Sequence, residues 1–226
     1  MPFDPFGDFN LRGYLRNSRG YKTASAIKRF EHGEYYENTQ TSRDFLAKAE
    51  VVDYTALLQT HRILFGSVYP WAGQDRTALM IETPIVKGRL HFATPEHIER
   101  LSAQALVLAG DKTIMAKQPG LVLGDLAYAH PFLEGNGRTF LAIVTELARR
   151  AGISIDWRGI PLHQYLSALT KEIVLPGEDN LDSFLKPYIR PNPDAGIVEE
   201  HQPVFTRPDP AARTLGNPNP VRRSRP

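Results

Sequence analysis

Apolar residues recur along this chain mainly at helical spacing, about 3.6 residues apart, and seldom alternate with polar ones. The pattern is clearest over residues 136–151, where Phe140, Val144, Leu147 and Ala151 mark one face. Two arginines and a glycine close this stretch, which is a common end of a helix. On the same grounds, helices are predicted over residues 22–32, 41–50, 53–65, 94–108, 121–128, 162–173 and 180–188, with a short helical turn over 11–16. Thr41 or Ser42 is the expected cap of the second of these helices, and Asn180 or Asp182 that of the last.

Loops and one hairpin are predicted between these helices. Polar residues 34–38 separate two of the helices, and the segment 69–73 contains both Pro and Gly, which predicts a turn. Residues 80–92 are the only strand-like region, because their apolar residues are separated by polar ones around a Lys-Gly turn. Pro84 has no N–H to give to a neighbouring strand, so this hairpin should lie at an edge. The prediction is an all-α protein with one short β-hairpin.

Length and composition are those of an ordinary globular protein. The 226 residues suffice for one domain with a substantial core, and the apolar and charged shares of 42% and 23% are average. The chain has no cysteine, which excludes disulfides and thiolate metal sites. No apolar run reaches the ~18 residues of a membrane span, and the first residues lack the features of a secretory signal peptide. We therefore expect a cytoplasmic protein.

Proline and arginine gather near the C-terminal end of the sequence. Nine of the 18 prolines lie from Pro187 onward, together with six of the 27 basic and four of the 25 acidic residues. Residues 1–186 therefore carry equal numbers of both charges, which argues against a nucleic-acid-binding face on the body. We expect one folded domain with an N-terminal arm over residues 1–190 and a disordered, Pro- and Arg-rich tail over residues 191–226.

Residues whose side chains can take part in catalysis or ligand binding are concentrated in the sequence HPFLEGNGR at positions 130–138. Pro131 disfavours helical backbone for the residue before it, so the preceding helix should end near His130. The next helix should begin within Gly-Asn-Gly, where glycines let backbone N–H groups face an anion at the positive end of the helix. Arg138 adds donors for phosphate oxygens, and Glu134 is an acid that suits Mg²⁺ beside a phosphate. This stretch predicts a phosphate-handling site.

Single residues of this kind usually serve structure, and only their joint arrangement argues for chemistry. Lone histidines are more often structural than catalytic, and Gly-x-Gly occurs in many turns. His61 in the 53–65 helix and Trp71 in the following turn are accordingly expected to be structural. His91 and His97 lack the spacing of metal ligands and have no cysteine beside them, so a metal site there is rejected.

The sequence HPFLEGNGR resembles the signature of the Fic family, His-Pro-Phe-x-acid-Gly-Asn-Gly-Arg, at all nine positions. Two further stretches are similar to the same family: GDF with GYLRN inside residues 7–17, and FGSVYPWAG at residues 65–73. The resemblance covers residues 7–190. It implies a Fic-type helical bundle with a short β-hairpin flap. It also implies a protein adenylyltransferase, an enzyme that transfers AMP from ATP to a Tyr, Thr or Ser hydroxyl of a target protein.

The resemblance also implies a role for each residue of the motif. His130 would be the general base that takes the proton of the target hydroxyl. Glu134 would hold a Mg²⁺ ion that bridges the α- and β-phosphates of ATP, and Arg138 would bind the β-phosphate. Phe132 would point into the core and fix the loop. The anion hole would be formed by Gly135, Asn136 and Gly137.

The predicted hairpin is the second element to which the resemblance gives a role. Its residue pattern alone favours a solvated hairpin with no partner. In Fic proteins, however, a hairpin before the motif forms a flap that aligns the target segment beside the nucleotide, and an exposed edge can accept another strand. The residues expected to dock the target are Ile81, Glu82, Thr83, Ile85 and Lys87.

Two departures from the family pattern affect the phosphate side of the site. Many members carry a second arginine three residues after the first, where this chain has Leu141. Leu141 would either face the outer phosphates or pack inward with the apolar stripe. Many members also carry, or receive from a partner, a Ser/Thr-x-x-x-Glu-Gly/Asn helix whose glutamate blocks ATP. This chain has no clear copy, because Glu37-Asn38 is preceded by Gly33 at the hydroxyl position, so autoinhibition of that kind is not expected.

Alternatives to AMP transfer stay open at this point. One is a Fic-type transferase of another phosphate-linked group, such as UMP, phosphate or phosphocholine, and another is a non-catalytic binding module. The expected partners are a target protein and a separate antitoxin-type inhibitor, but neither nucleic acid nor a membrane. The arginines at positions 213, 222, 223 and 225 resemble the basic signals of some type IV secretion substrates, so translocation of a bacterial protein into a host cell is the alternative to a cytoplasmic location.

Overall fold

The computed structural model describes residues 3–88 and 90–192, which fold mainly into helices. The α-helices are α1 (Phe9–Arg12), α2 (Ala24–Lys48), α3 (Tyr54–Phe65), α4 (Ile98–Gly110), α5 (Lys112–Lys117), α6 (Pro119–Ala129), α7 (Asn136–Arg150), α8 (Leu162–Val174) and α9 (Asn180–Leu185). Short 3₁₀ turns are η1 (Tyr14–Arg16), η2 (Pro95–His97), η3 (Trp157–Gly159) and η4 (Lys186–Tyr188). None of the helices in this described part is long and apolar enough to cross a membrane.

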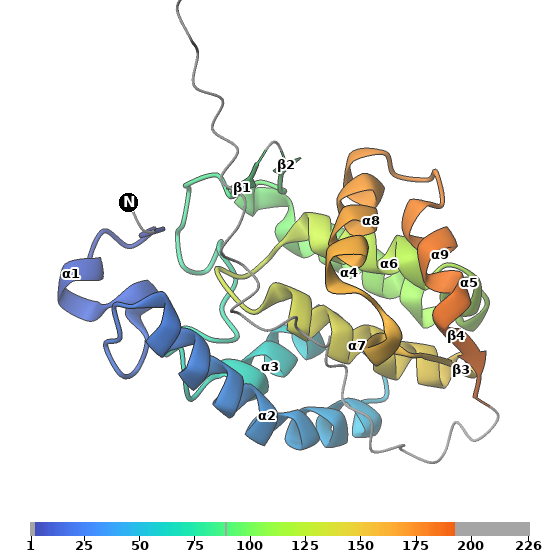
Figure 1. Cartoon of the computed structure of the whole chain (residues 1–226), viewed down its shortest axis with the longest axis horizontal. Helices are drawn as coiled ribbons and strands as arrows, with labels where there is room; N and C mark the ends of the chain where they lie inside the picture. The colour runs from blue at the N-terminus through green and yellow to red at the C-terminus, as the bar shows by residue number, and fades with distance from the viewer. Residues whose placement is uncertain (1–2, 89, 193–226) are drawn as a thin grey trace, which may run out of the picture.

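The helix α7 runs through the middle of the molecule (Figure 1). It packs against α2 and α3 on one side and against α6 on the other, and α6 is covered in turn by α4, α8 and α9. Most residues of α6 are buried, as expected for a helix that is apolar on all sides. This helical bundle confirms the predicted fold class.

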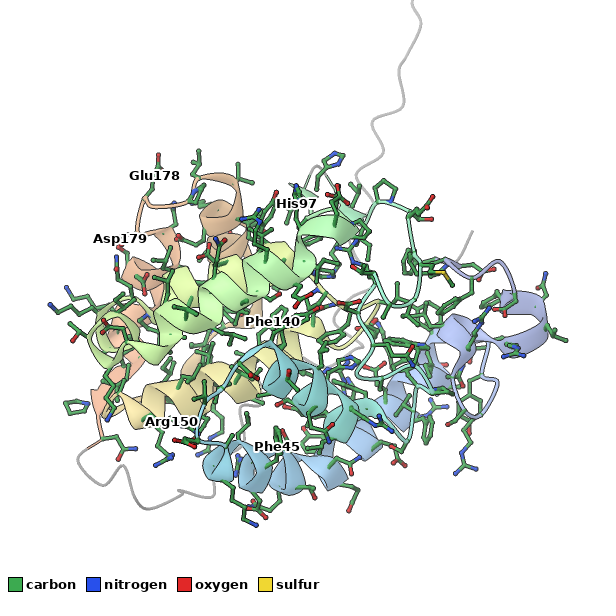
Figure 2. All side chains as sticks on the ribbon, turned by 180° about the vertical axis from the view of Figure 1, so that it is seen from behind. Phe45, His97, Phe140, Arg150, Glu178 and Asp179 are labelled. Atoms are coloured by element: carbon green, nitrogen blue, oxygen red, sulfur yellow. The ribbon has the colours of Figure 1, made fainter. Side chains whose placement is uncertain are left out.

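Residues at the two ends of α7 connect it to different parts of the molecule. Phe140, near the start of the helix, is buried in the middle of the structure, and Arg150 lies at its far end beside α2 (Figure 2). The Arg150 guanidinium donates to the carbonyl oxygens of Leu46 at 2.6 Å and Ala49 at 2.7 Å. Both carbonyl groups lie at the C-terminal end of α2, where Ala49 is the C-cap residue, so Arg150 ties the two helix ends together.

Two short antiparallel sheets occur in the described residues. β1 (Val86–Lys87) pairs with β2 (Leu90–His91), which confirms the predicted hairpin but limits its paired part to two residues on each side. β3 (Ile153–Ile155) pairs with β4 (Ile189–Pro191), where Ile155 lies opposite Ile189. The sequence predicts residues 153–157 only as an extended link, because their partner strand lies more than thirty residues further along the chain.

The prediction of two helices over 22–32 and 41–50 with a loop between them is wrong, because α2 is continuous. Thr41 and Ser42, the two residues expected to cap the second helix, both lie inside α2, and Thr23 caps its start by accepting the Ala26 N–H at 3.4 Å. Half of the buried positions on α2 are polar, so the apolar period is interrupted although the helix is not. The buried positions are Ile27, Glu31, Tyr35, Thr39, Ser42 and Leu46.

The predicted cap of the last helix is also wrong. The sequence predicts Asn180 or Asp182 in that role, but neither side chain caps α9. The Asp182 carboxylate instead accepts the N–H groups of Gly120 at 2.6 Å and Leu121 at 2.9 Å at the start of α6. Burial raises the pKa of Asp182 to about 6, against the lowering effect of these two hydrogen bonds.

Candidate active site

The end of α6 fixes the backbone of His130. The helix stops at Ala129, as predicted, and His130 adopts a left-handed conformation with φ of 44° and ψ of 57°. Such a conformation costs energy for a residue with a side chain, so surrounding contacts must hold it. The fully buried Arg76 supplies them, because its guanidinium donates to the carbonyl oxygens of His130 at 2.9 Å and Ala93 at 2.6 Å.

The imidazole of His130 is almost completely enclosed. Its exposed fraction is 6%, and it stacks on Phe92, with 4.0 Å between ring centroids. Burial and, to a smaller extent, the positive charges of Lys87 and Arg76 lower the pKa of His130 to about 3. The ring is therefore neutral at physiological pH and retains a lone pair that can accept a proton.

The loop after His130 is closed by one amide side chain. Asn136 accepts the N–H of Phe132 at 2.9 Å and donates to the carbonyl of the same residue at 2.7 Å. The Phe132 ring is fully buried and stacks on His61, with 3.7 Å between ring centroids. Asn136 thus fixes the loop with its side chain, a role that is additional to the anion-binding one expected from the sequence.

His61 is structural, as expected, and it contacts the same loop through the Phe132 ring and the Glu134 carbonyl. Its Nδ1 accepts the N–H of Gly73 at 2.9 Å, so the proton lies on Nε2, which faces the Glu134 carbonyl at 3.0 Å. Burial lowers the pKa of His61 to about 3, which keeps this tautomer neutral. Trp71 is likewise buried in the core. The turn before the hairpin is thereby connected to the motif loop.

Two glycines shape the start of α7. Gly135 has φ of 81°, and a Cβ atom there would lie 2.6 Å from the Phe65 ring, so glycine is the residue that fits. A Cβ atom on Gly137 would meet nothing within 4 Å, which leaves the backbone open to close approach. No side chain caps this helix, so its first N–H groups and the positive end of its dipole are available to an anion.

The two charged residues of the motif differ in their surroundings. Glu134 has a side chain that is 38% exposed, and one of its oxygens accepts the Gly135 N–H at 3.0 Å. Arg138 makes an ion pair with Glu31, a buried carboxylate on α2. Glu31 is not among the site residues predicted from the sequence. Its position four residues from both Ile27 and Tyr35, on one helix face, is the only signal that could have placed it inward.

These residues surround one cleft of about 1060 Å³. The cleft is bordered by α2, the flap hairpin, the end of α6, the start of α7, and α8. The predicted site residues that line it are His130, Glu134, Gly135, Asn136, Gly137, Arg138 and Lys87. The other predicted flap residues do not line it: Ile81 and Ile85 are buried in the core, whereas Glu82 and Thr83 are exposed.

Leu141 lies one helical turn after Arg138 and lines the same cleft. It is nevertheless only 3% exposed and belongs to the apolar core. The inward-packing alternative therefore describes this side chain, which forms part of the cleft floor. It offers no hydrogen-bond donor there, whereas Lys22, Lys28 and Lys87 on the cleft wall carry positive charge.

Comparison with known proteins shows the family of this chain. The sequence profile of the Fic/DOC family matches residues 51–148, which include the whole motif. The probable protein adenylyltransferase y4lH of Sinorhizobium fredii is 32% identical over 166 residues, which are 70% of this chain and 82% of that protein. The chain belongs to the Fic/DOC family. The protein adenylyltransferase VbhT of Bartonella schoenbuchensis is 31% identical over 163 residues, which are 68% of this chain but only 32% of VbhT.

Solved structures show the same Fic fold. The N-terminal Fic domain of a putative cell filamentation protein from Bartonella quintana, with bound ADP, superposes with a TM-score of 0.66 at 19% identity. This superposition covers 83% of this chain and 95% of that one. The BepC protein of Bartonella tribocorum, with bound AMPPNP, superposes with a TM-score of 0.63 at 17% identity and covers 77% and 91% of the two chains. The resemblance to the Fic family and the expected helical fold are thereby confirmed.

Proposed function

We propose that this protein is an adenylyltransferase that transfers AMP from ATP to a hydroxyl side chain of a target protein. The observation that carries the proposal is the placement of a neutral, enclosed His130 in the same cleft as the uncapped start of α7 and Arg138. The names of two relatives, both adenylyltransferases, support the choice of AMP over other groups.

The transfer is a single displacement. His130 accepts the proton of the target hydroxyl as its oxygen attacks the α-phosphorus of ATP. A bond forms between that oxygen and the phosphorus, and the bond from the phosphorus to the bridging oxygen breaks, so that pyrophosphate leaves. The negative charge of the bound phosphates opposes the effect of Lys87 and Arg76 and raises the basicity of His130 when the nucleotide is present.

The residues around the phosphates provide positioning and charge stabilisation. Backbone N–H groups at the start of α7, at Asn136 and Gly137 and at Gly135 once Glu134 releases it, would bind oxygens of the α- and β-phosphates, and Arg138 would bind the β-phosphate. No group of three or more His, Cys, Asp or Glu in the described residues could hold a metal alone. The exposed Glu134 carboxylate fits a Mg²⁺ ion that takes its other ligands from phosphates and water, and such an ion would neutralise charge on the leaving group.

The flap is proposed to align the target chain beside the α-phosphate. β1 is an edge strand, and Lys87 on it reaches the cleft wall. The exposed Glu82 and Thr83 precede it, so the segment from 82 to 87 offers backbone groups to an extended target segment. The buried Ile81 and Ile85 anchor this segment rather than contact the target.

Two further expectations from the family resemblance belong to this proposal. One is a separate inhibitory protein of the antitoxin type. The other is translocation into a host cell, and several of the similar Bartonella structures are of effector proteins described as VirB-translocated. The arginines expected to form the secretion signal lie outside the described residues.

A labelled-transfer assay tests the proposal. The purified protein, Mg²⁺ and bacterial or host cell lysate are incubated with ATP labelled at the α-phosphate, with ATP labelled at the γ-phosphate, or with α-labelled UTP. The proposal predicts that, relative to the same lysate without the purified protein, only α-labelled ATP gives additional label on a protein. Label from the γ-position would indicate phosphate transfer, label from UTP would indicate uridylylation, and no label from any donor would favour the non-catalytic module.

A further inference from the structure

Glu31 is a buried carboxylate that reaches the motif from α2. Its side chain is 7% exposed, and it lies on the helix face that packs toward α7. A buried carboxylate is stable only when it is paired and hydrogen-bonded. One Glu31 oxygen accepts from the Arg138 guanidinium, and the other accepts from the Tyr69 hydroxyl at 2.6 Å. Both oxygens are therefore engaged.

Tyr69 holds Glu31 in place. The Tyr69 ring is fully buried and stacks on Trp71 with 4.7 Å between ring centroids, and the Trp71 indole N–H donates to the Leu15 carbonyl at 2.8 Å. Burial raises the pKa of Tyr69, and the nearby carboxylate of Glu134 raises it further, so the hydroxyl stays protonated and donates. The Glu31 carboxylate is thus fixed by a rigid donor from a different part of the chain.

Arg138 is oriented by the remaining contacts. Its guanidinium lies over the ring of Phe65 at 4.6 Å and over that of Tyr35 at 5.4 Å, measured to the ring centroids. Glu31 binds one of its terminal nitrogens, and the side chain lines the cleft with 24% of its surface exposed. The same terminal nitrogen lies 3.8 Å from a Glu134 oxygen, so both carboxylates approach one end of a guanidinium that carries five N–H donors in a planar fork.

We propose that Glu31, fixed by Tyr69, is a positioning residue that presents the Arg138 guanidinium to the β-phosphate of the nucleotide. This inference rests on the proposed nucleotide site and adds a residue outside the motif to it. It matters more in this chain because Leu141 gives no second cation from α7, so Arg138 is the cation that the start of this helix offers to the phosphates.

The opposite arrangement is a competition, in which Glu31 occupies Arg138 and must leave before a phosphate binds. Competition and positioning predict opposite changes in nucleotide affinity when Glu31 is replaced. A competing carboxylate weakens nucleotide binding, so its removal tightens ADP and ATP. A positioning carboxylate strengthens binding, so its removal weakens both. AMP has no β-phosphate, so its affinity measures the contacts of the rest of the site and should not change under either model.

The experiment measures the affinities of AMP, ADP and ATP with Mg²⁺ by calorimetric titration of the full chain. The variants are Glu31→Ala, Tyr69→Phe and Arg138→Ala, with the double variant of Glu31 and Arg138. Glu37→Ala is the matched control, because Glu37 is an exposed glutamate on the same helix. Melting curves of every variant verify folding, and Tyr69→Phe, which removes one hydroxyl, tests the same contact with less disturbance.

We expect Glu31→Ala to weaken ADP and ATP at least about tenfold, the loss of one well-oriented charge-assisted contact, and to leave AMP within about twofold. Tyr69→Phe should act in the same direction, and Glu31→Ala should add nothing in the Arg138→Ala background. Tighter ADP binding, or an equal loss for all three nucleotides, overturns the inference while leaving the proposed function intact. Failure of the wild-type protein to bind any of the three contradicts the proposed function itself.

Discussion

His130 combines a strained backbone with an enclosed ring, and both features follow from groups outside the motif. Arg76 holds the backbone, whereas Phe92 and Lys87 surround the imidazole. The motif sequence is sufficient to predict the helix end and a base at that position. Arg76 and Phe92 are not predictable in the same way, because their contacts join residues that are remote in the sequence.

His130→Ala should abolish transfer of label from ATP while the melting temperature at pH 7 stays within a few degrees of wild type. The imidazole is the only group assigned to accept the hydroxyl proton, and its removal leaves the backbone contacts of Arg76 in place. The measurement is initial transfer rate beside a melting curve. Residual transfer close to the wild-type rate would remove His130 from the mechanism.

The lowered pKa of His130 should make the free energy of unfolding depend on pH. In the unfolded chain the ring titrates near pH 6.5, and in the folded protein near pH 3, so the unfolded state binds one more proton between these values. The folded state therefore loses about 1.4 kcal/mol per pH unit from this residue as the pH falls through that range. Denaturant unfolding at several pH values should show this slope reduced by that amount in His130→Ala. Parallel curves for the two proteins would contradict the buried neutral state.

Leu141 is the residue whose role the sequence left open. Because it is buried on the cleft floor, Leu141→Arg should destabilise the protein by about 3 kcal/mol, the usual cost of an unpaired buried charge or a disrupted core. Leu141→Met is the control of similar volume and should cost less than about 1.5 kcal/mol. A melting curve and titration with ATP decide the matter. A stable Leu141→Arg protein that binds ATP more tightly would show that the position faces the phosphates.

At the scale of elements, α2 shows where pattern analysis fails and why. Its buried face carries Glu31, Thr39 and Ser42, so the apolar stripe that marks a helix in sequence is missing from its middle. The sequence therefore predicts two short helices. By contrast α3, α6, α7 and α8 bury apolar faces and lie within a few residues of their predicted bounds.

The flap is the element on which a target prediction can be made. Thr83→Pro removes one exposed backbone donor before β1 and touches no buried side chain. We expect it to lower target labelling at least about fivefold, in line with the loss of one or two backbone contacts, and to leave ATP affinity unchanged. Ile85→Val is the matched control, since Ile85 anchors the segment in the core. An equal loss of labelling and of ATP affinity would indicate a flap that serves structure only.

At the scale of the whole molecule, the end of the described chain returns to the body. β4 pairs with β3, and the Asn192 N–H donates to the Gly152 carbonyl at 2.9 Å, two residues beyond the boundary predicted at residue 190. The sequence could not supply this contact, because a three-residue pairing between distant segments leaves no periodic signal. The predicted disorder of the Pro- and Arg-rich tail concerns residues that lie, from 193 on, outside the described part.

Two truncated chains test separately what the tail after Asn192 and the strand β4 contribute to stability. A chain that ends at Asn192 should keep its unfolding free energy within about 0.5 kcal/mol and its full transfer rate, because proline- and arginine-rich sequence lacks the apolar residues of a core. A chain that ends at Pro187 also loses β4 and should unfold about 1–3 kcal/mol more easily. Denaturant titration of the two proteins measures the difference. A large loss of stability in the longer of them would show that the tail packs.

The central claim is that AMP becomes attached to a protein hydroxyl with His130 as the base. The most direct measurement is mass spectrometry of the labelled target, purified after reaction with the wild-type protein and, in parallel, with His130→Ala. We expect a mass increase of one AMP group on a single Tyr, Thr or Ser residue with the wild-type protein and an unmodified target with the variant. A different added group, or the same AMP adduct with His130→Ala, would contradict it.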